Sequence, residues 1–210
     1  MTDIQPENYV PASKDKIKSR VTFLAIIGVF VLPFVILPLI MSPAKMNKTN
    51  KGVLLEPHVV FAGVQAAEIK NLSAIKNKWI LLYFVPDKCA QTCINALYSM
   101  RQVPKTLAHD ADRVQSLLVR TVEMNAEFDS LVEKEFTVMS QARADKNNID
   151  IAFAQALPGI DVSQAGYIYL MSPDGYVFMY YPSYKDEQEA INHALDIRSD
   201  LKKTIKGSRI

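Results

Sequence analysis

Residues 79–93 read W-I-L-L-Y-F-V-P-D-K-C-A-Q-T-C and contain the strongest structural signal in the chain. It opens with a run of seven apolar residues, 79–85, which a proline closes. Continuous rather than alternating hydrophobicity predicts a central strand that is buried on both faces of a sheet. Two cysteines four positions apart, Cys89 and Cys93, follow directly. We therefore expect a buried strand that leads into a segment carrying a pair of thiols.

The rest of the C-terminal part predicts an alternation of helices and strands. In chain order we expect a helix from Cys89 to about His109, a strand over residues 113–121, a helix over 127–145, a strand over 167–171, its hairpin partner over 176–181, and a helix over 186–206. The mixed composition of residues 62–78 predicts a loop with a short strand or helix. Helical crossovers followed by a hairpin and a helix make an α/β sheet. This is the order of a thioredoxin-like fold.

An uncharged stretch of 21 residues, 21–41, lies near the N-terminus and reads VTFLAIIGVFVLPFVILPLIM. About 20 apolar residues cross a bilayer as a helix, and such a helix tolerates prolines. A buried core helix would normally show polar residues. A cleaved signal peptide has a shorter apolar region and a small-residue cleavage site, which residues 41–44 match poorly. We therefore expect one uncleaved transmembrane helix over 21–41.

Four lysines and arginines precede this stretch and three lysines follow it closely, which favours an N-terminus inside the cell. The expected organisation is a short cytoplasmic tail over 1–20, the transmembrane helix, a linker and lead-in segment over 42–61, and a thioredoxin-like domain over 62–210. The protein would then be a single-pass protein of the inner membrane with its C-terminal domain in the periplasm. The 210 residues carry a net charge of only +2, which argues against a nucleic-acid partner.

The cysteine pair is the main indication of function in the sequence. Two cysteines are too few for a disulfide scaffold or a self-sufficient zinc site. Directly after a strand, Cys89 and Cys93 would share one face of a helix N-terminus. There the helix dipole and the free N–H groups favour thiolate over thiol, and Lys88 adds positive charge. Thiolates attack disulfides and bind soft ions such as Cu(I). Four interpretations of the pair stay open here: a redox pair, a Cu(I) site, a structural disulfide, or two unrelated buried cysteines.

The membrane stretch, residues 79–93 and the segment Y-I-Y-L-M-S-P-D-G over 167–175 together resemble the SCO/SenC family of membrane-tethered, thioredoxin-like copper proteins. The resemblance covers the membrane stretch and about residue 78 to the C-terminus. It implies a role in assembling the binuclear copper centre of cytochrome c oxidase. It also implies an oxidase subunit or another assembly factor as partner, and copper as cofactor.

The chain departs from that family at the copper site, which in the family uses both cysteines and one histidine. Aligning Y-L-x-x-P-D-G with residues 169–175 places Gln164 at the position of the histidine, and glutamine is a poor ligand for a soft metal. We expect the three histidines of the chain, His58, His109 and His193, to be solvated or structural. The cysteines therefore carry over as candidate functional residues, and the histidine does not.

We expect the cysteines to act by dithiol–disulfide exchange on a partner, which would make the protein a thiol–disulfide oxidoreductase that assists oxidase assembly. Cys89 is the expected attacking thiol because it is nearer the helix start, and Cys93 then resolves the mixed disulfide. Two alternatives stay open. One is Cu(I) delivery with Cys89 and Cys93 as ligands beside an unconventional third ligand. The other is a non-catalytic assembly scaffold.

Overall fold

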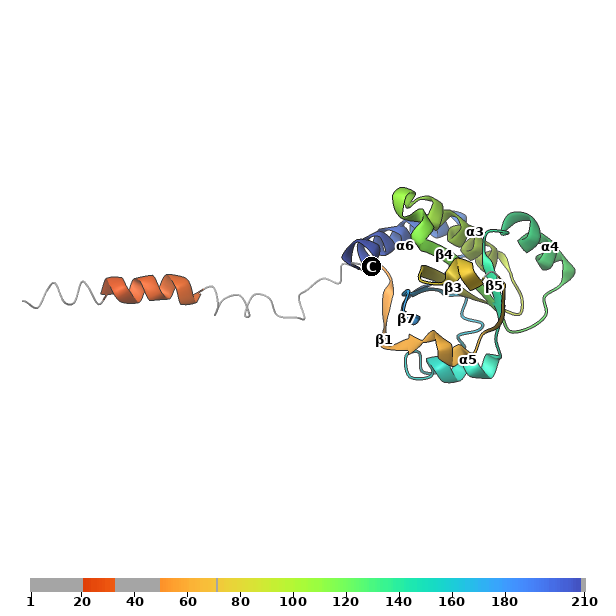
Figure 1. Cartoon of the computed structure of the whole chain (residues 1–210), viewed down its shortest axis with the longest axis horizontal. Helices are drawn as coiled ribbons and strands as arrows, with labels where there is room; N and C mark the ends of the chain where they lie inside the picture. The colour runs from red at the N-terminus through yellow and green to blue at the C-terminus, as the bar shows by residue number, and fades with distance from the viewer. Residues whose placement is uncertain (1–20, 33–49, 71, 209–210) are drawn as a thin grey trace, which may run out of the picture. The chain divides into compact units, whose positions relative to one another are not determined.

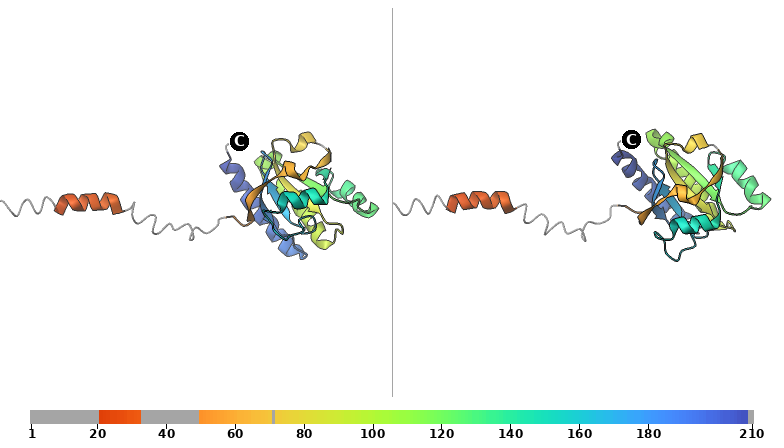
Figure 2. Two further views of the ribbon diagram at one scale, coloured as in Figure 1. Left: turned by 90° about the horizontal axis from the view of Figure 1, so that it is seen from below. Right: turned by 60° about the horizontal axis from the view of Figure 1, so that its bottom comes forward.

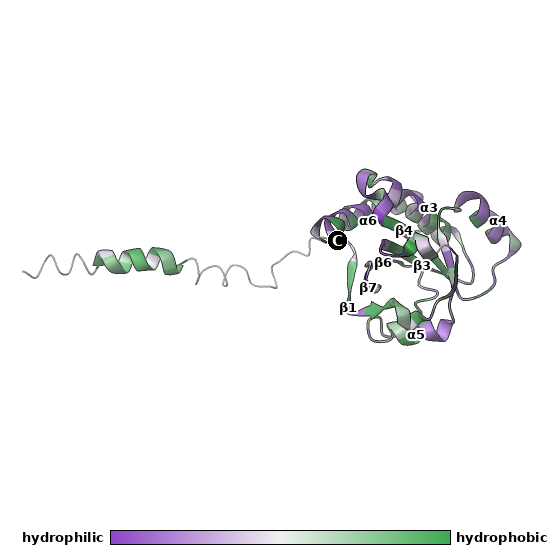
Figure 3. Ribbon diagram, in the orientation of Figure 1, coloured by the Kyte–Doolittle hydropathy of each residue, from purple (hydrophilic) through white to green (hydrophobic). Residues whose placement is uncertain are grey.

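The computed structural model describes residues 21–32, 50–70 and 72–208. The chain divides into two compact units, Met1–Thr49 and Asn50–Ile210. In the first unit, residues 21–32 form a helix that Figure 3 shows as hydrophobic along its length. Its large apolar side chains are exposed, with Phe23 at 65% and Phe30 at 71%.

The expected transmembrane helix over 21–41 falls only partly within these ranges. Residues 21–32 are helical, whereas residues 33–41 lie outside the described part of the chain. The expected cytoplasmic tail over 1–20 and residues 42–49 of the expected linker lie outside it as well. Among the described residues, no helix combines the length and the apolar character that a membrane crossing needs.

The second unit is built on a mixed sheet of seven strands (Figure 1). These are β1 (Val53–Val60), β2 (Ala67–Lys70), β3 (Trp79–Val85), β4 (Val114–Arg120), β5 (Ser140–Arg143), β6 (Ile168–Met171) and β7 (Tyr176–Tyr181). Their order in the sheet, β1-β7-β6-β3-β4-β5-β2, places β3 at the centre. β3 pairs with β4 in parallel and with β6 in antiparallel fashion. Every residue of β3 is buried, which confirms the expected central strand.

Helices cover both faces of this sheet. They are η2 (Phe61–Val64), α2 (Leu72–Ile75), α3 (Gln91–Lys105), η3 (Ala108–Arg113), α4 (Ala126–Glu135), α5 (Lys146–Phe153) and α6 (Glu187–Gly207). Figures 1 and 2 show α3, α4 and α6 on one face and α5 on the other. The α/β architecture predicted from the sequence is therefore present.

The uninterrupted apolar run of β3 follows from this layering, because alternate side chains of the strand enter two different cores. Leu81, Tyr83 and Val85 pack in a core with buried residues of α3, α4 and α6, including Cys93. Ile80, Leu82 and Phe84 pack in a second core with buried residues of α5 and β1. The strand that leads to the cysteines is thus held rigidly from both sides.

Two parts of the sheet differ from the sequence-based expectation. The expected helix over 127–145 is wrong beyond Glu135, because α4 ends there and residues 140–143 form β5, followed by α5. The four residues of β5 have no apolar run, and their strand conformation comes from pairing with β4, where Ser140 lies opposite Leu117. Residues 53–60, expected within the linker and lead-in segment, form β1 and pair with β7.

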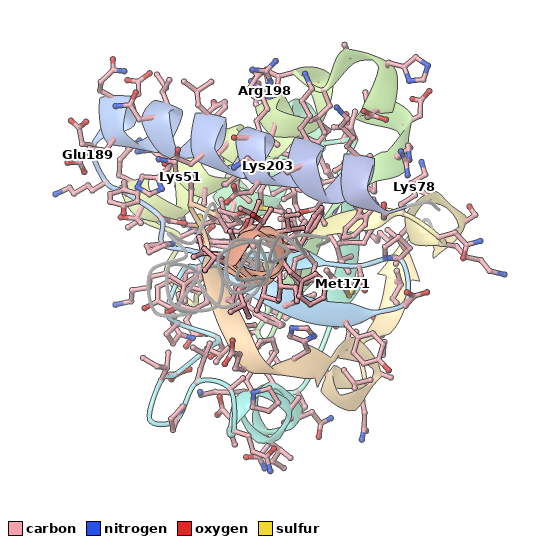
Figure 4. All side chains as sticks on the ribbon, turned by 90° about the vertical axis from the view of Figure 1, so that its left-hand side faces the viewer. Lys51, Lys78, Met171, Glu189, Arg198 and Lys203 are labelled. Atoms are coloured by element: carbon pink, nitrogen blue, oxygen red, sulfur yellow. A yellow bond between two sulfur atoms is a disulfide. The ribbon has the colours of Figure 1, made fainter. Side chains whose placement is uncertain are left out.

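A buried carboxylate fixes the start of the second unit. Asp200 of α6 accepts hydrogen bonds from the backbone N–H groups of Lys51 (2.6 Å) and Gly52 (2.9 Å) and from the hydroxyl of Tyr181 (3.3 Å). The ammonium group of Lys203 lies 3.3 Å from the other carboxylate oxygen. In Figure 4, Lys51 and Lys203 both lie on the lower side of α6. The chain is therefore tied to α6 just before β1 begins.

Candidate functional site

Cys89 and Cys93 are joined by a disulfide bond, with their Cα atoms 5.1 Å apart. The bond lies at the carboxyl end of β3, where the chain turns from the central strand into α3. Cys93 is buried, with 2% of its surface exposed, whereas Cys89 is half-buried. A partner that approaches from solvent therefore reaches the sulfur of Cys89 first.

The helix start differs by two residues from the expectation. α3 begins at Gln91, so Cys89 lies in the preceding loop and not on the helix. Ala90 is the N-cap residue in an extended conformation, and its N–H group donates to the carbonyl of Lys88 (3.0 Å). This turn brings Cys89 back against the first turn of the helix, where Cys93 lies. The two sulfurs meet although only one cysteine is helical.

The electrostatic setting of the helix start favours a negative sulfur. The N-cap has no side-chain hydrogen bond, and the first turn of α3 holds no acidic residue. The positive end of the helix dipole and the unpaired N–H groups there are thus not neutralised by a carboxylate on the same turn. Exposed Lys88 adds a positive charge beside Cys89. Once the disulfide is reduced, these groups stabilise a thiolate.

Two clefts flank the disulfide. The first has a volume of about 400 Å³, and we call it the Cys89 cleft; it is lined by Asp87, Lys88, Cys89, Ile94, Met124, Asn125, Glu127, Phe128 and Leu131. The second has a volume of about 510 Å³, and we call it the Cys93 cleft; it is lined by Tyr83, Pro86, Asp87, Lys88, Ala90, Thr92, Cys93, Gln164, Ala165 and Gly166. Each cysteine of the pair therefore lines its own cleft.

The start of α4 supplies the apolar wall of the Cys89 cleft. Asn125 caps this helix by accepting a hydrogen bond from the N–H group of Phe128 (2.9 Å). Arg120, at the end of β4, pairs with Asp129 (2.5 Å) and lies 5.3 Å from the centre of the Phe128 ring. These contacts hold Phe128 against the cleft. The sequence does not reveal this wall because α4 is remote from the cysteines in the chain.

Gln164, which the resemblance aligns with the histidine of the family, lines the Cys93 cleft. Its side-chain oxygen accepts a hydrogen bond from the backbone N–H group of Asp87 (3.2 Å), two residues before Cys89. Its amide nitrogen donates to Ser163 (3.3 Å). The side chain therefore links the loop before β6 to the loop that carries Cys89.

The histidines lie elsewhere. His58 of β1 contacts the edge of the Phe178 ring, His109 belongs to η3, and His193 of α6 stacks on Tyr184 at 3.9 Å between ring centres. Within residues 21–32, 50–70 and 72–208, no group of three cysteine, histidine, aspartate or glutamate side chains is arranged to hold a metal ion. The donor set around the cysteine pair does not fit the three-ligand copper site of the SCO/SenC family.

The Cys93 cleft is also lined by a tyrosine whose hydroxyl the apolar pattern of β3 does not single out. Tyr83 of β3 is 0% exposed, and its hydroxyl has no hydrogen-bond partner in the described part of the chain. A Cβ atom added to Gly166 would lie 3.5 Å from this hydroxyl, so the loop before β6 covers it closely. Burial raises the pKa of Tyr83 well above its ordinary value, so the group stays a protonated donor.

Comparisons with known proteins found similar solved structures and one matching family. No curated protein sequence matches the chain. Similar solved structures include copper-bound ScoI of Arabidopsis thaliana (15% identity, 60% of this chain and 88% of that chain covered, TM-score 0.42). Copper-bound ScoI of Bradyrhizobium japonicum is similar at 18% identity (59% and 87% covered, TM-score 0.36). The thioredoxin domain of a thiol-disulfide oxidoreductase of Bacteroides vulgatus is similar at 15% identity (58% and 82% covered, TM-score 0.39).

The sequence profile of one family covers most of the second unit. It is described as "Transmembrane-like, thioredoxin-like, C-terminal domain" and matches residues 79–206, from the first residue of β3 into α6. The match spans more than half of the chain and includes both cysteines. The chain therefore belongs to the transmembrane-like, thioredoxin-like, C-terminal domain family.

Proposed function

We propose that the protein exchanges thiols and disulfides with a partner protein through Cys89 and Cys93. The observation that carries this proposal is the disulfide at the start of α3, with one half-buried and one buried sulfur beside open clefts. The two cysteines have different roles because their exposure to solvent differs. Cys89 forms the bond to the partner, and Cys93 resolves it.

The exchange runs in two steps that conserve atoms and electrons. In the reduced protein, the Cys89 thiolate attacks one sulfur of a partner disulfide, and the other partner sulfur leaves as a thiolate and takes up a proton. The Cys93 thiol then loses its proton, attacks the Cys89 sulfur and releases the second partner sulfur. The Cys89–Cys93 disulfide is restored, and two electrons have passed to the partner. The reverse sequence oxidises a partner dithiol, and the two reduction potentials set the direction.

The Cys89 cleft supports a polypeptide as the substrate. Ile94, Phe128 and Leu131 give it an apolar wall, while Lys88 and Glu127 are exposed charges in its lining. A partner segment bonded to Cys89 would place the residues next to its own cysteine in this cleft. Apolar burial beside the mixed disulfide would then stabilise the intermediate.

We further propose that the partner takes part in assembling the copper centre of cytochrome c oxidase, as an oxidase subunit or another assembly factor. The support is the resemblance of residues 79–93 and 167–175 to the SCO/SenC family. The exposed apolar side chains of the helix over 21–32 support a membrane tether. We place the second unit in the periplasm, where disulfides persist.

Trapping of the mixed disulfide tests the exchange. Cys93→Ser keeps the attacking thiol and removes the resolving one, so adducts with the partner should accumulate in membranes and disappear with dithiothreitol. Cys89→Ser is the matched control, because it retains a single buried thiol. We expect mass spectrometry to find a cysteine-containing oxidase subunit or assembly factor in the Cys93→Ser adduct. Adducts no more abundant than in the control would overturn the proposal.

The two alternatives make different predictions for the same cysteines. A scaffold role would leave oxidase activity unchanged in a strain that carries Cys89→Ser and Cys93→Ser, at every copper concentration. Copper delivery would require Cu(I) binding under anaerobic conditions that is tighter than binding to the double variant. Exchange predicts loss of oxidase activity together with Cu(I) binding no tighter than that of the double variant.

A further inference from the structure

The proposed exchange leaves the buried Tyr83 hydroxyl unexplained. A buried hydroxyl without a partner destabilises a protein, and phenylalanine would fill the same space without that cost. Tyr83 packs in the same core as Cys93, and both residues line the Cys93 cleft. The unpartnered donor therefore belongs to the same core and the same cleft as the cysteine that resolves the mixed disulfide.

We propose that the Tyr83 hydroxyl donates a hydrogen bond to the Cys93 sulfur when the pair is reduced, and that it thereby tunes the redox equilibrium. The inference rests on the exchange function and deepens it. In the oxidised protein, the Cys93 sulfur is bonded to Cys89 and is a weak acceptor. Reduction turns it into a buried thiol that must ionise before it attacks, and a buried negative charge needs a donor.

Other groups along the Cys93 cleft are less suited to this task. Asp87 and Lys88 are its charged lining residues and both are exposed, so solvent screens them. Glu127, from α4, lines the Cys89 cleft and is not among the lining residues of the Cys93 cleft. Gln164 already uses its side-chain amide on Asp87 and Ser163. Tyr83 is the lining donor that is both fully buried and unpartnered within the described residues.

The hydrogen bond would favour the reduced protein in a pH-dependent way. A donor to the Cys93 thiolate lowers the pH at which this thiol ionises and stabilises the reduced pair above that pH. In Tyr83→Phe we expect the ionisation midpoint of Cys93 to rise by about one pH unit, because the thiolate loses one hydrogen bond to a charged group. Above that midpoint, the equilibrium constant for reduction falls about tenfold, which corresponds to about 30 mV toward more negative potential. The oxidised protein loses no hydrogen bond.

The full-length protein equilibrated in glutathione buffers between pH 6 and pH 10 provides the test. Tyr169→Phe is the matched control, because the Tyr169 hydroxyl is also buried and unpartnered within the described residues but lies in the second core. We expect the tenfold shift at high pH in Tyr83→Phe and the wild-type curve in Tyr169→Phe. A wild-type curve in Tyr83→Phe, or an equal shift in the control, would overturn the inference.

A second measurement on the wild-type protein covers the case in which Tyr83→Phe does not fold. The ¹³C resonance of the Tyr83 ring carbon that bears the hydroxyl should move on reduction, and that of Tyr169 should not. An unmoved Tyr83 resonance would also overturn the inference. Both measurements use glutathione alone, so they are independent of the partner. Failure of the trapping experiment would refute the exchange with a cellular partner, whereas failure here would refute only the role of Tyr83.

Discussion

Replacing Asp200 by alanine should strongly destabilise the second unit. One oxygen of this buried carboxylate accepts hydrogen bonds from the N–H groups of Lys51 and Gly52 and from the Tyr181 hydroxyl. A hydrogen bond to a charged group contributes about 1.5–3 kcal/mol. The two backbone donors can regain water by a small opening at the start of the unit, so the contributions do not add fully. We expect the free energy of unfolding to fall by about 3–5 kcal/mol.

Asp200→Asn is the matched control for this prediction. Its amide oxygen can occupy the position at which the three hydrogen bonds meet, so the variant loses the charge and keeps the acceptor. The expected loss is about 1–2 kcal/mol. Urea unfolding followed by the fluorescence of Trp79, which is buried in β3, measures both variants. A loss below about 1 kcal/mol in Asp200→Ala, or equal losses in the two variants, would show that these hydrogen bonds do not hold the start of the second unit.

Three further predictions follow from the site and its supporting loop. Gly166→Ala should cost about 1–2 kcal/mol of unfolding free energy, because residue 166 has a φ of +64°; an unchanged urea midpoint would contradict this. After reduction, iodoacetamide should modify Cys89 at least about tenfold faster than Cys93, because only Cys89 is accessible; peptide mass spectrometry measures the two rates, and equal rates would count against the assignment. The hydrogen bond from Lys146 lowers the pKa of Asp161 in the folded protein, so the unfolded state binds the proton more tightly. The ionised Asp161 therefore stabilises the folded state fully above its ordinary pKa, and this stabilisation is lost as the pH falls through the lowered pKa. Between pH 2 and pH 6, the free energy of unfolding should therefore fall less with decreasing pH in Asp161→Asn than in the wild-type protein. The same fall in both proteins would contradict this prediction.

The sequence predicted correctly those strands whose own residues show a clear local pattern. The seven apolar residues of β3 indicated burial on both faces, and the structure buries all of them. The hairpin partner over 176–181 was predicted with the bounds of β7, because residues 172–175 form a turn in which Gly175 adopts a φ of +84°. By contrast, β5 has a weak local pattern and becomes a strand through its pairing with β4. The residues of β5 alone therefore do not predict that it is a strand.

The site divides in the same way. The spacing of the cysteines in the sequence indicated the pair, whereas only the resemblance to the SCO/SenC family pointed to Gln164. The Cys89 cleft was not predicted, since Met124 and Phe128 reach it from the β4–α4 connection and from α4. In the sequence, Tyr83 stands as one of seven consecutive apolar residues, and nothing there distinguishes its hydroxyl. Whether a buried hydroxyl has a partner depends on the loops that fold over it.

The rate at which Cys89 reacts with a small disulfide is the most direct measure of an activated thiol at this site. In a Cys93→Ser variant at pH 7, oxidised glutathione should react with Cys89 of the folded chain at least about tenfold faster than with the same chain in urea, because the start of α3 and Lys88 favour the thiolate. Thiolate absorbance at 240 nm should show an ionisation midpoint below that of the unfolded chain. A folded chain that reacts no faster than the unfolded one would contradict the account.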